Sequence, residues 1–408
     1  MKWRDSTLGK LTAEDDGLIQ TGPFGSQLHQ ADYQPEGIPV IMPKDIADGR
    51  VLVESVARVS EETANRLERH KLKPRSIVLP RRGEVTKRAF IRAEQEGWLC
   101  GTGCLKIELS GKELVPEFLY YFMEQGHVVQ WLEQHAVGTT MLNLSAGIVA
   151  DLPIHYPAIE VQHEIADVLS SYDSLIENNL RRMKLLEESA RLLYREWFVR
   201  LRFPGHEHTR IVNGVPEGWE KKSLSELTDY ISRGIAPQYD DDAEGIVINQ
   251  KCIRNGRLDL SLARHQSREF TPVRQVQVGD VLINSTGEGT LGRVAQVKAP
   301  IPNCTVDTHI TIVRPKTGLG MQYFGMVLME WESQFSTMGR GATNQTELSR
   351  ATIGETEILI PTHALVQEFE SYVDPISQQN TNLIEQNQKL KAARDLLLPK
   401  LMSGEIAV

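Results

Sequence analysis

Two matching stretches of the sequence decide the fold: GTTMLNLSAGIVADLPIHYP at residues 138–157 and GATNQTELSRATIGETEILIP at residues 341–361. Shorter matches repeat the relation upstream: Trp3 with Trp219, Val40-Ile41 with Val247-Ile248, and Gly83 with Gly287. The offset settles at 204 residues, which is 361 minus 157. A period this long indicates a duplicated domain, because solenoid repeats run to ~20–50 residues. The sequence therefore predicts two similar domains related by a pseudo-two-fold axis.

A long helix is predicted to follow each copy. From residue 159 to about residue 201, apolar residues keep a spacing of three and four with no Pro or Gly, which is typical of a coiled-coil seam. The first seam contains Ile165, Val168, Tyr172, Ile176, Met183, Leu186, Ala190, Leu193 and Trp197. The second seam contains Phe369, Tyr372, Ile376, Leu383, Asn387, Leu390, Leu397 and Leu401. We expect the helices to pair antiparallel, because the linker after Leu201 is too short to return the chain along the whole helix.

Two positions of these helices carry separate expectations. Asn179 falls on the first seam, where a buried amide could specify register. Alternatively Asn179 faces solvent and Leu180 turns inward, and the sequence leaves both readings open. Pro375 is expected to interrupt or kink the second helix, because proline lacks a backbone donor and clashes with the preceding turn.

The predicted fold class is α+β, with two tandem mixed α/β domains separated by two long helices that form an antiparallel coiled coil. The boundaries are 1–157 for the first domain, 158–202 for the first helix, 203–215 for a linker, 216–361 for the second domain and 362–408 for the second helix and tail. Within the first domain an amphipathic helix is predicted at residues 117–134, where apolar residues keep roughly helical spacing.

The charge pattern leaves the partner undecided. The 408 residues carry a net charge of −9, which argues mildly against nucleic acid, although acidic helices can mask basic domain faces. The densest basic cluster lies between residues 75 and 92, where Glu84 is the only acid. It contains Arg75, Arg81, Arg82, Lys87, Arg88 and Arg92. In the second copy the cations are spread over Lys251, Arg254, Arg257, Arg264, Arg268, Arg274 and Arg293.

Cysteine usage and hydropathy indicate a reduced, cytoplasmic chain. The four cysteines Cys100, Cys104, Cys252 and Cys304 form neither a disulfide framework nor a four-cysteine zinc pattern. No apolar stretch is long enough to span a membrane, and no basic-then-apolar leader follows Met1.

Residues 287–292, GEGTLG, match a GxGxxG pattern formally. A dinucleotide or S-adenosylmethionine site needs a helix to begin at the last glycine. The following residues instead continue as a strand, so we predict the tip of a β-hairpin. No Walker motif, amino-methylation tetrapeptide or nuclease cluster is present, and residues 206–208 (HEH) lie in the linker. We therefore expect no catalytic and no metal-binding residues, which is typical of an adaptor.

The helices carry the most specific signatures of the chain. IENN at 176–179, LLE at 185–187 and ARLLYREWF at 190–198 together resemble the central conserved region of specificity subunits of Type I restriction-modification systems. RDLLLPKLMSGEI at 394–406 resembles the distal conserved region of that family, and PEGWE at 216–220 resembles the opening of a target-recognition domain. The resemblance covers the whole chain. The first domain departs from it in lacking the Pro-x-Gly before Trp3.

The resemblance implies a phage-defence function without chemistry of its own. Each of the two target-recognition domains would read one half of an asymmetric, bipartite double-stranded DNA site, and the coiled coil would set the spacing. The helices would also dock two methyltransferase subunits, and restriction subunits would join the full complex. S-adenosylmethionine, ATP and Mg²⁺ would bind to those partner subunits, and no cofactor or membrane partner is expected for this chain.

Base reading needs polar groups on rigidly held loops, together with cations that contact phosphate. We place these loops at 80–88 and 138–143 in the first domain and at 284–293 and 339–345 in the second. The candidate DNA-binding residues are Lys44, Arg50, Arg81, Arg82, Lys87, Arg88, Thr139, Thr140, Asn143, Lys251, Arg257, Ser285, Thr286, Arg293, Arg340, Thr343, Asn344 and Gln345. The candidate subunit-docking residues are Leu193, Tyr194, Trp197, Phe198, Leu397, Leu401 and Met402.

Two other functions compete with the specificity subunit. A methyltransferase that uses the 287–292 loop would bind cofactor by itself. A stand-alone bipartite DNA-binding or scaffold protein would use the coiled coil only to join two domains and would need no enzymatic partner.

Overall fold

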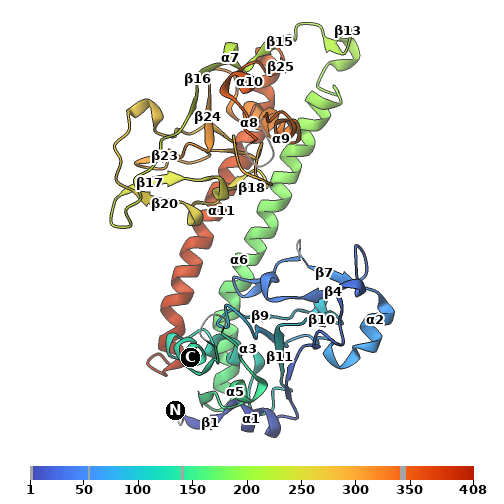
Figure 1. Cartoon of the computed structure of the whole chain (residues 1–408), viewed down its shortest axis with the longest axis vertical. Helices are drawn as coiled ribbons and strands as arrows, with labels where there is room; N and C mark the ends of the chain where they lie inside the picture. Colours follow the sequence, from blue (N-terminus) through green and yellow to red (C-terminus); the bar gives the residue numbers. More distant parts are fainter. Residues whose placement is uncertain (1–2, 54–55, 139–141, 341–345) are drawn as a thin grey trace. The chain divides into compact units, whose positions relative to one another are not determined.

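The computed structural model describes residues 3–53, 56–138, 142–340 and 346–408 (Figure 1). The chain forms two compact units. Unit 1 contains residues 1–178 and 386–408, and unit 2 contains residues 179–385. The division between the units therefore runs through both long helices, and each unit holds one mixed domain together with a part of each helix.

Unit 1 is built around two four-stranded sheets with the orders β2-β11-β8-β9 and β10-β4-β7-β3, and β1 pairs with β12. Its strands are β1 (Arg4–Thr7), β2 (Leu18–Thr21), β3 (Tyr33–Gln34), β4 (Ile38–Ile41), β5 (Ile46–Ala47), β6 (Arg50–Val51), β7 (Ala57–Val59), β8 (Ile77–Pro80), β9 (Ala89–Phe90), β10 (Leu99–Cys100), β11 (Cys104–Glu108) and β12 (Pro153–Tyr156). Its helices are α1 (Leu8–Glu14), α2 (Glu61–Arg66), α3 (Pro116–Phe122), α4 (Gly126–His135), α5 (Ala146–Ala150) and the first part of α6 (Ile159–Tyr194).

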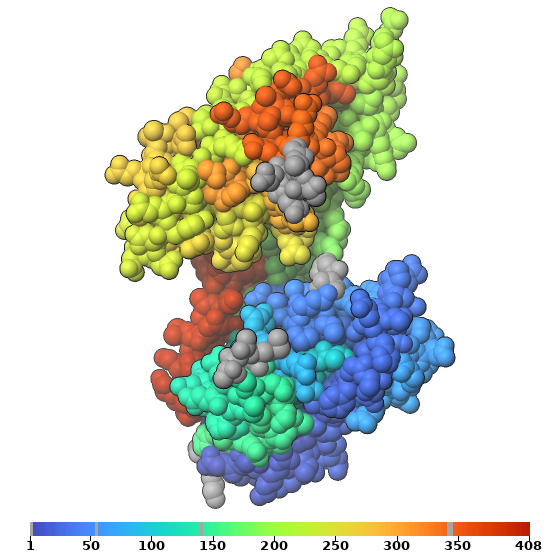
Figure 2. Space-filling view, in the orientation of Figure 1, coloured from blue at the N-terminus to red at the C-terminus, as the bar shows by residue number. Residues whose placement is uncertain are grey.

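Unit 2 repeats this plan. Its main sheet has the order β16-β24-β21-β22, a second sheet has the order β20-β17-β23, and β15 pairs with β25. Its strands are β13 (Ile211–Val212), β14 (Val215–Pro216), β15 (Glu220–Ser223), β16 (Thr228–Arg233), β17 (Gly245–Ile248), β18 (Ile253–Arg254), β19 (Arg257–Leu258), β20 (Arg264–Gln266), β21 (Val281–Asn284), β22 (Val294–Gln296), β23 (Cys304–Val306), β24 (Ile310–Pro315) and β25 (Glu357–Ile360). Its helices are α7 (Leu224–Leu227), α8 (Met321–Glu330), α9 (Glu332–Thr337), α10 (Arg350–Gly354) and the first part of α11 (His363–Met402). On the face seen in Figure 2, the chain between β17 and β22 (yellow) and the chain around α10 (orange) form separate parts of the surface of unit 2.

The repeated Leu-Ser pair explains why both copies fold alike. Leu144 and Leu348 are fully buried in the cores of their units. The next residue begins a short helix in each copy: the Ser145 hydroxyl accepts the N–H of Ile148, and the Ser349 hydroxyl accepts the N–H of Thr352. A serine at this position satisfies a backbone donor that the first helical turn leaves unpaired. The predicted duplication of the α+β domain is therefore confirmed.

Within each unit the two long helices pack against each other and against the mixed domain. In unit 1 the beginning of α6, with Ile165 and Leu169, shares one core with the end of α11, with Leu398 and Leu401. In unit 2 the end of α6 shares a core with the beginning of α11. Since early residues of one helix meet late residues of the other, the pairing is antiparallel, as predicted.

Aromatic side chains fill the helix junction of unit 2. The ring of Phe198 lies 4.7 Å from the ring of Tyr323 and 4.9 Å from that of Phe369, measured between centroids. Trp197 lies 5.9 Å from Phe369, and Tyr194 is 6.3 Å from the same ring. Edge-to-face and tilted ring contacts at these separations add to the stabilisation from burial. We call Tyr194, Trp197, Phe198, Tyr323 and Phe369 the aromatic cluster.

Two of the predicted helices differ from expectation. The single helix predicted at 117–134 is two helices, α3 and α4, because the chain breaks at residues 123–125. The predicted interruption at Pro375 is wrong, since α11 is assigned as one helix from His363 to Met402. Pro375 and Ser371, whose carbonyl loses its helical donor, are both exposed, so water can satisfy that carbonyl.

The seam is largely as predicted. Asn179 is 7% exposed, so the buried alternative holds for this residue, while Leu180 is half-buried. Tyr372 departs from the prediction because it is 55% exposed, although its ring still contacts that of Trp197 at 5.9 Å.

The glycine-rich stretch is a hairpin, as predicted. β21 and β22 pair antiparallel with Ile283 opposite Val294, and Gly287, Gly289 and Gly292 in the connection all have positive φ. Gly287–Gly292 therefore precedes a strand, without the helix that a phosphate-binding loop requires. Across the part of the chain that the structure describes, no helix is long and apolar enough to cross a membrane.

Candidate functional site

The two candidate loops of the first domain meet in unit 1. Arg82 and Asn143 form an isolated antiparallel β-bridge. One residue further along, the N–H of Leu144 donates to the carbonyl of Arg81 over 2.8 Å. Backbone pairing therefore holds these two loops side by side, although they are about 60 residues apart in the sequence.

Unit 2 repeats this arrangement at equivalent positions. Thr286 and Glu347 form the corresponding bridge, and the N–H of Leu348 donates to the Ser285 carbonyl over 2.9 Å. The bridge residues lie 204 positions after their counterparts, since 286 minus 82 and 347 minus 143 both give 204. We call the loops joined at Arg82–Asn143 in unit 1 and at Thr286–Glu347 in unit 2 the backbone frame. The frame is therefore duplicated, while the side chains on it differ.

A third loop, which the sequence analysis did not identify, completes the frame in both units. In unit 1 the N–H of Arg81 donates to the carbonyl of Gly103 over 2.7 Å. In unit 2 the N–H of Ser285 donates to the carbonyl of His309 over 2.8 Å. The side chain of His309 also bonds to that of Thr286, with 2.6 Å between Nδ1 and Oγ1. Sequence alone gave no signal for this loop, because its two copies share no motif.

Several predicted cations of unit 1 are accessible. Arg82 and Lys44 are exposed, and Arg50 is half-buried in the β5–β6 turn. Lys87 is ion-paired with Glu84 of the same loop, so its charge is partly neutralised within the chain.

Two other cations of unit 1 have internal contacts. The Arg81 guanidinium lies 5.6 Å from the ring centre of Phe24, which is 58% exposed and was not predicted as a site residue. The prediction of Arg88 as a DNA contact is not supported, because its side chain is only 10% exposed. Arg88 forms an ion pair with Glu124 at 3.0 Å and donates to the Tyr120 carbonyl, so it holds the domain together.

Unit 2 corrects one predicted contact, Ser285, and gives a second, Arg257, an ion pair within the chain. Ser285 is fully buried and its hydroxyl lies 2.6 Å from that of Thr311, so the hydroxyl is not available to DNA. The Arg257 guanidinium pairs with Glu187 of α6, with 3.2 Å between Nε and Oε2. This ion pair joins the domain to the helix within unit 2, but the Arg257 side chain is 56% exposed, so its contact with DNA stays a prediction.

The remaining described candidates of unit 2 are exposed or half-buried. Lys251 and Arg340 are exposed. Arg293 is half-buried and donates to the Gly289 carbonyl over 2.9 Å within its own loop. The predicted residues that lie outside the described part of the chain are Thr139, Thr140, Thr343, Asn344 and Gln345.

The predicted docking residues are part of the internal core, which corrects their assignment. Tyr194, Trp197, Phe198, Leu401 and Met402 are each less than 8% exposed, and Leu193 and Leu397 pack against the same cores. Side chains this buried cannot contact another subunit without unfolding the junction. The leucines one position earlier, Leu192 and Leu396, are 60% and 65% exposed and are equivalent under the repeat, since 396 minus 192 is 204.

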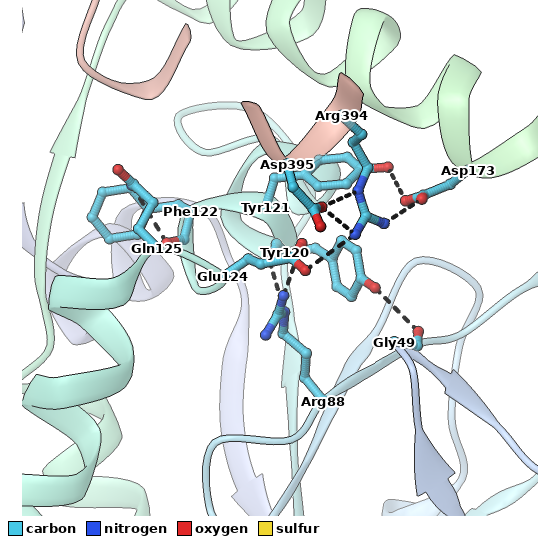
Figure 3. Close-up of polar contacts among 10 residues, drawn as sticks. All are labelled: Gly49, Arg88, Tyr120, Tyr121, Phe122, Glu124, Gln125, Asp173, Arg394 and Asp395. Carbon is cyan, nitrogen blue, oxygen red and sulfur yellow. Dashed lines mark hydrogen bonds and ion pairs between the residues drawn. The ribbon is translucent and has the colours of Figure 1, made fainter. Parts of the chain in front are cut away.

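A polar network joins α11 to the mixed domain in unit 1 (Figure 3). The Arg394 guanidinium donates to Asp173 of α6 and lies 3.5 Å from Glu124, which in turn pairs with Arg88. The hydroxyl of Tyr121 donates to the other oxygen of Asp173 over 2.7 Å. Burial alone would lower the pKa of Arg394, but its bonds to carboxylates and their charges raise that pKa above its ordinary value. We call Arg394, Asp173, Glu124, Arg88 and Tyr121 the Arg394 network.

The described residues offer little catalytic chemistry. Burial raises the pKa of the Cys100 and Cys304 thiols to about 12, so neither is a ready nucleophile. Burial also raises the pKa of Asp307, which accepts the N–H of His309 over 2.8 Å. No group of three or more His, Cys, Asp or Glu residues in the described ranges could hold a metal ion.

Comparison with known proteins agrees with the resemblance found in the sequence. Residues 20–188 match the model of the Type I restriction modification DNA specificity domain. Residues 20–188 are thus similar to the DNA specificity domain of Type I restriction-modification systems, and the resemblance inferred from the sequence is confirmed.

Individual relatives extend the similarity to the whole chain. The Type I restriction enzyme MjaIX specificity subunit of Methanocaldococcus jannaschii is 26% identical over 434 residues, covering 100% of this chain and 97% of that protein. The HindI specificity subunit of Haemophilus influenzae is 22% identical over 391 residues, covering 78% of this chain and 83% of that protein. A crystal structure of the Type-I restriction-modification system S subunit from M. genitalium has a TM-score of 0.58 at 17% identity, covering 98% of this chain and 96% of that one, and supports the fold.

Proposed function

We propose that this chain is the non-catalytic DNA-specificity subunit of a Type I restriction-modification complex. The duplicated frame carries the proposal: the bridges Arg82–Asn143 and Thr286–Glu347 are equivalent in position but differ in side chain. Recognition of two different half-sites needs a constant frame with different base-contacting groups. Unit 1 reads one half of an asymmetric, bipartite DNA site and unit 2 reads the other half.

The exposed cations beside each frame contact DNA phosphates. Lys44 and Arg82 serve this purpose in unit 1, and Lys251 and Arg340 serve it in unit 2. Such contacts position the chain on the duplex without carrying sequence information, and the paired helices set the spacing between the two half-sites.

Leu192 and Leu396 support the docking of two methyltransferase subunits. They are exposed apolar side chains at equivalent positions of α6 and α11, so two copies of one partner can bind in equivalent ways. Restriction subunits join the full complex through this assembly. S-adenosylmethionine, ATP and Mg²⁺ bind to these partners, and this chain determines which DNA sequence the complex recognises.

The test is co-expression of this chain with the methyltransferase subunit encoded beside it, followed by mapping of methylated adenines in the host DNA. We expect methylation at one split motif. A matched double variant, Leu192→Asp with Leu396→Asp, is expected to abolish methylation while the purified chain still binds DNA.

The outcomes separate the alternatives. DNA binding with no partner and no methylated motif would favour a stand-alone bipartite DNA-binding or scaffold protein. Neither binding nor methylation would contradict both functions. Normal methylation by the double aspartate variant would remove these two leucines from the docking surface and leave the specificity function standing.

A further inference from the structure

At one place in the duplicated frame, the long and the short residue are exchanged between the two facing loops when unit 1 is compared with unit 2. β21 and β24 pair with Asn284 opposite Ile310, and the next residues outward are Ser285 and His309. In unit 1, β8 and β11 pair with Pro80 opposite Cys104, and the next residues outward are Arg81 and Gly103. The backbone bond from the first residue to the second is conserved between the units, at 2.8 Å and 2.7 Å. His309 and Gly103 therefore occupy the same place.

Each unit has one long polar side chain at this place, but it follows β8 in unit 1 and precedes β24 in unit 2. Unit 1 has an exposed arginine at position 82 and a glycine at position 103. Gly103 has a φ of +89°, a conformation that L side chains rarely adopt, so a side chain there would be strained. Unit 2 has the short Thr286 where unit 1 has Arg82, and it has His309 where unit 1 has Gly103.

The imidazole of His309 is exposed but firmly held. Thr286 Oγ1 lies 2.6 Å from Nδ1, and the backbone N–H of His309 donates to the buried carboxylate of Asp307 over 2.8 Å. Arg233 bonds to the carbonyl of Thr308 over 3.2 Å and to that of Leu348 over 2.9 Å, which ties this loop to the neighbouring one.

These bonds leave the far side of the ring available. Among the residues that the structure describes, no protein group bonds to Nε2 of His309. Since Thr286 is bonded to Nδ1, the tautomer that it selects decides whether Nε2 donates or accepts. A ring oriented by its neighbours and carrying one free polar atom suits recognition of a base edge.

We propose that His309 is a specificity-determining residue of unit 2, contacting a base edge in the second half-site from the position that Gly103 occupies in unit 1. Thr286 is its positioning residue, acting through the bond to Nδ1. The assignment rests on the proposed function, because it requires that the duplicated frame faces DNA.

The test is methylation mapping with the full chain and its methyltransferase partner, comparing the wild type with His309→Ala. We expect the first half-site to stay unchanged and one base of the second half-site to lose discrimination by roughly 5- to 20-fold, the range of a single polar base contact. Unchanged readout of the other bases of the second half-site also shows that unit 2 of the variant is folded. His208→Ala, which removes an exposed histidine outside the candidate loops of the same unit, is the matched control and is expected to leave both half-sites unchanged.

Two further variants test how His309 acts. Thr286→Val keeps the size of the side chain but removes the bond to Nδ1, and a smaller loss of discrimination at the same base is expected. The double variant Thr286→Arg with His309→Gly copies the unit 1 arrangement into unit 2, and we expect discrimination at that one base to be lost while DNA binding is retained.

Each contrary outcome points to a different error. A uniform weakening over all sequences would overturn base reading by His309, since phosphate contacts weaken binding evenly. An unchanged second half-site would also overturn the assignment, and the ring would then be surface structure. A wild-type chain that selects no split motif would overturn the proposed function itself, and the assignment with it.

Discussion

The two helix junctions occupy equivalent places in the repeat, and each adds a different kind of contact to its apolar core. At the junction of unit 1, Arg394 joins the carboxylates of Asp173 and Glu124. The equivalent residue of unit 2, 204 positions earlier, is the buried Ala190, and its neighbours belong to the aromatic cluster. Leu401 of unit 1 likewise corresponds to Trp197 of unit 2.

The difference shows how a duplicated chain can keep its halves distinct. With identical junctions, either helix end could pack on either domain. With one charged junction and one aromatic junction, a helix end packs poorly on the domain of the other unit. Placing an unpaired arginine among aromatic rings costs desolvation energy, and placing rings among carboxylates leaves those charges unpaired. We infer that the two junctions specify which helix end belongs to which domain.

The largest expected effect comes from opening the aromatic cluster. Trp197→Ala removes a buried ring and leaves a cavity, so we expect a loss of about 3–5 kcal/mol in the free energy of unfolding of unit 2. Hydrogen exchange of peptides from each unit separates the two responses, and unit 1 is expected to remain protected. Leu192→Ala, at an exposed site on the same helix, is the control and should cost less than about 0.5 kcal/mol. Equal loss of protection in both units would mean that the junctions are not independent.

Breaking the polar junction is expected to have a smaller effect. Arg394→Met preserves much of the side-chain length but removes the cation that pairs with Asp173 and leaves Glu124 only its pair with Arg88, at a cost of about 2–3 kcal/mol in unit 1. Combining it with Asp173→Asn should recover part of the loss, since one of the unpaired charges is then removed. Thermal denaturation of the three variants measures the coupling, and purely additive losses would contradict a shared network.

The two frames should also differ in their response to salt. Reversing the charge at Arg81 and Arg82 is expected to weaken DNA binding by roughly 10- to 100-fold and to reduce the salt slope by about 1–2. Unit 2 has Ser285 and Thr286 at these positions, so binding by its half should depend less on this strand end. Titration of the DNA complex at several salt concentrations gives the slope, and an unchanged slope would remove the 81–82 pair from the interface.

The smallest effect is a difference in acid response. Burial, with a further contribution from the charges of Arg69 and Lys106, lowers the pKa of His70 in unit 1 from 6.5 to about 4. Between pH 6.5 and about pH 4, His70 is protonated in the unfolded chain but neutral in the folded chain. The free energy of unfolding that depends on neutral His70 is therefore fully present above pH 6.5 and is lost as the pH falls toward 4. Position 274, the equivalent in unit 2, is an arginine, so unit 2 has no histidine there.

Hydrogen exchange at pH 7 and pH 5 can measure this response. Unit 1 is expected to lose protection at pH 5 in the wild type and to lose less in His70→Phe, after correction for the intrinsic exchange rate. An identical pH response in the variant would assign the acid sensitivity of unit 1 to other groups.

The local sequence was a reliable guide wherever a repeated short-range signal was present. The Leu144-Ser145 and Leu348-Ser349 pairs predicted equivalent elements, because a buried leucine followed by a helix-capping serine acts over only a few residues. The glycines at 287–292 predicted a hairpin for the same reason, since positive φ and the following strand are local properties.

Residue roles were harder to predict, because a role depends on what lies opposite in space. Arg88 sits in a basic run, yet Glu124 and Tyr120 pair with it from another helix. Trp197 and Phe198 belong to a signature suited to docking, yet they fill the core of unit 2. His309 had no sequence signal at all, since only the pairing of β21 with β24 brings it beside Thr286.

By itself the sequence determined the duplication, the α+β class, the two long helices and the family resemblance, because all of these depend on periodicity and short motifs within continuous stretches of chain. Only the tertiary structure decided which cations remain exposed, which leucines face outward and which loop completes each frame. Those properties depend on contacts between residues far apart in the sequence, such as Arg394 with Asp173 and Thr286 with His309. Such contacts cannot be predicted from the spacing of residues along the chain.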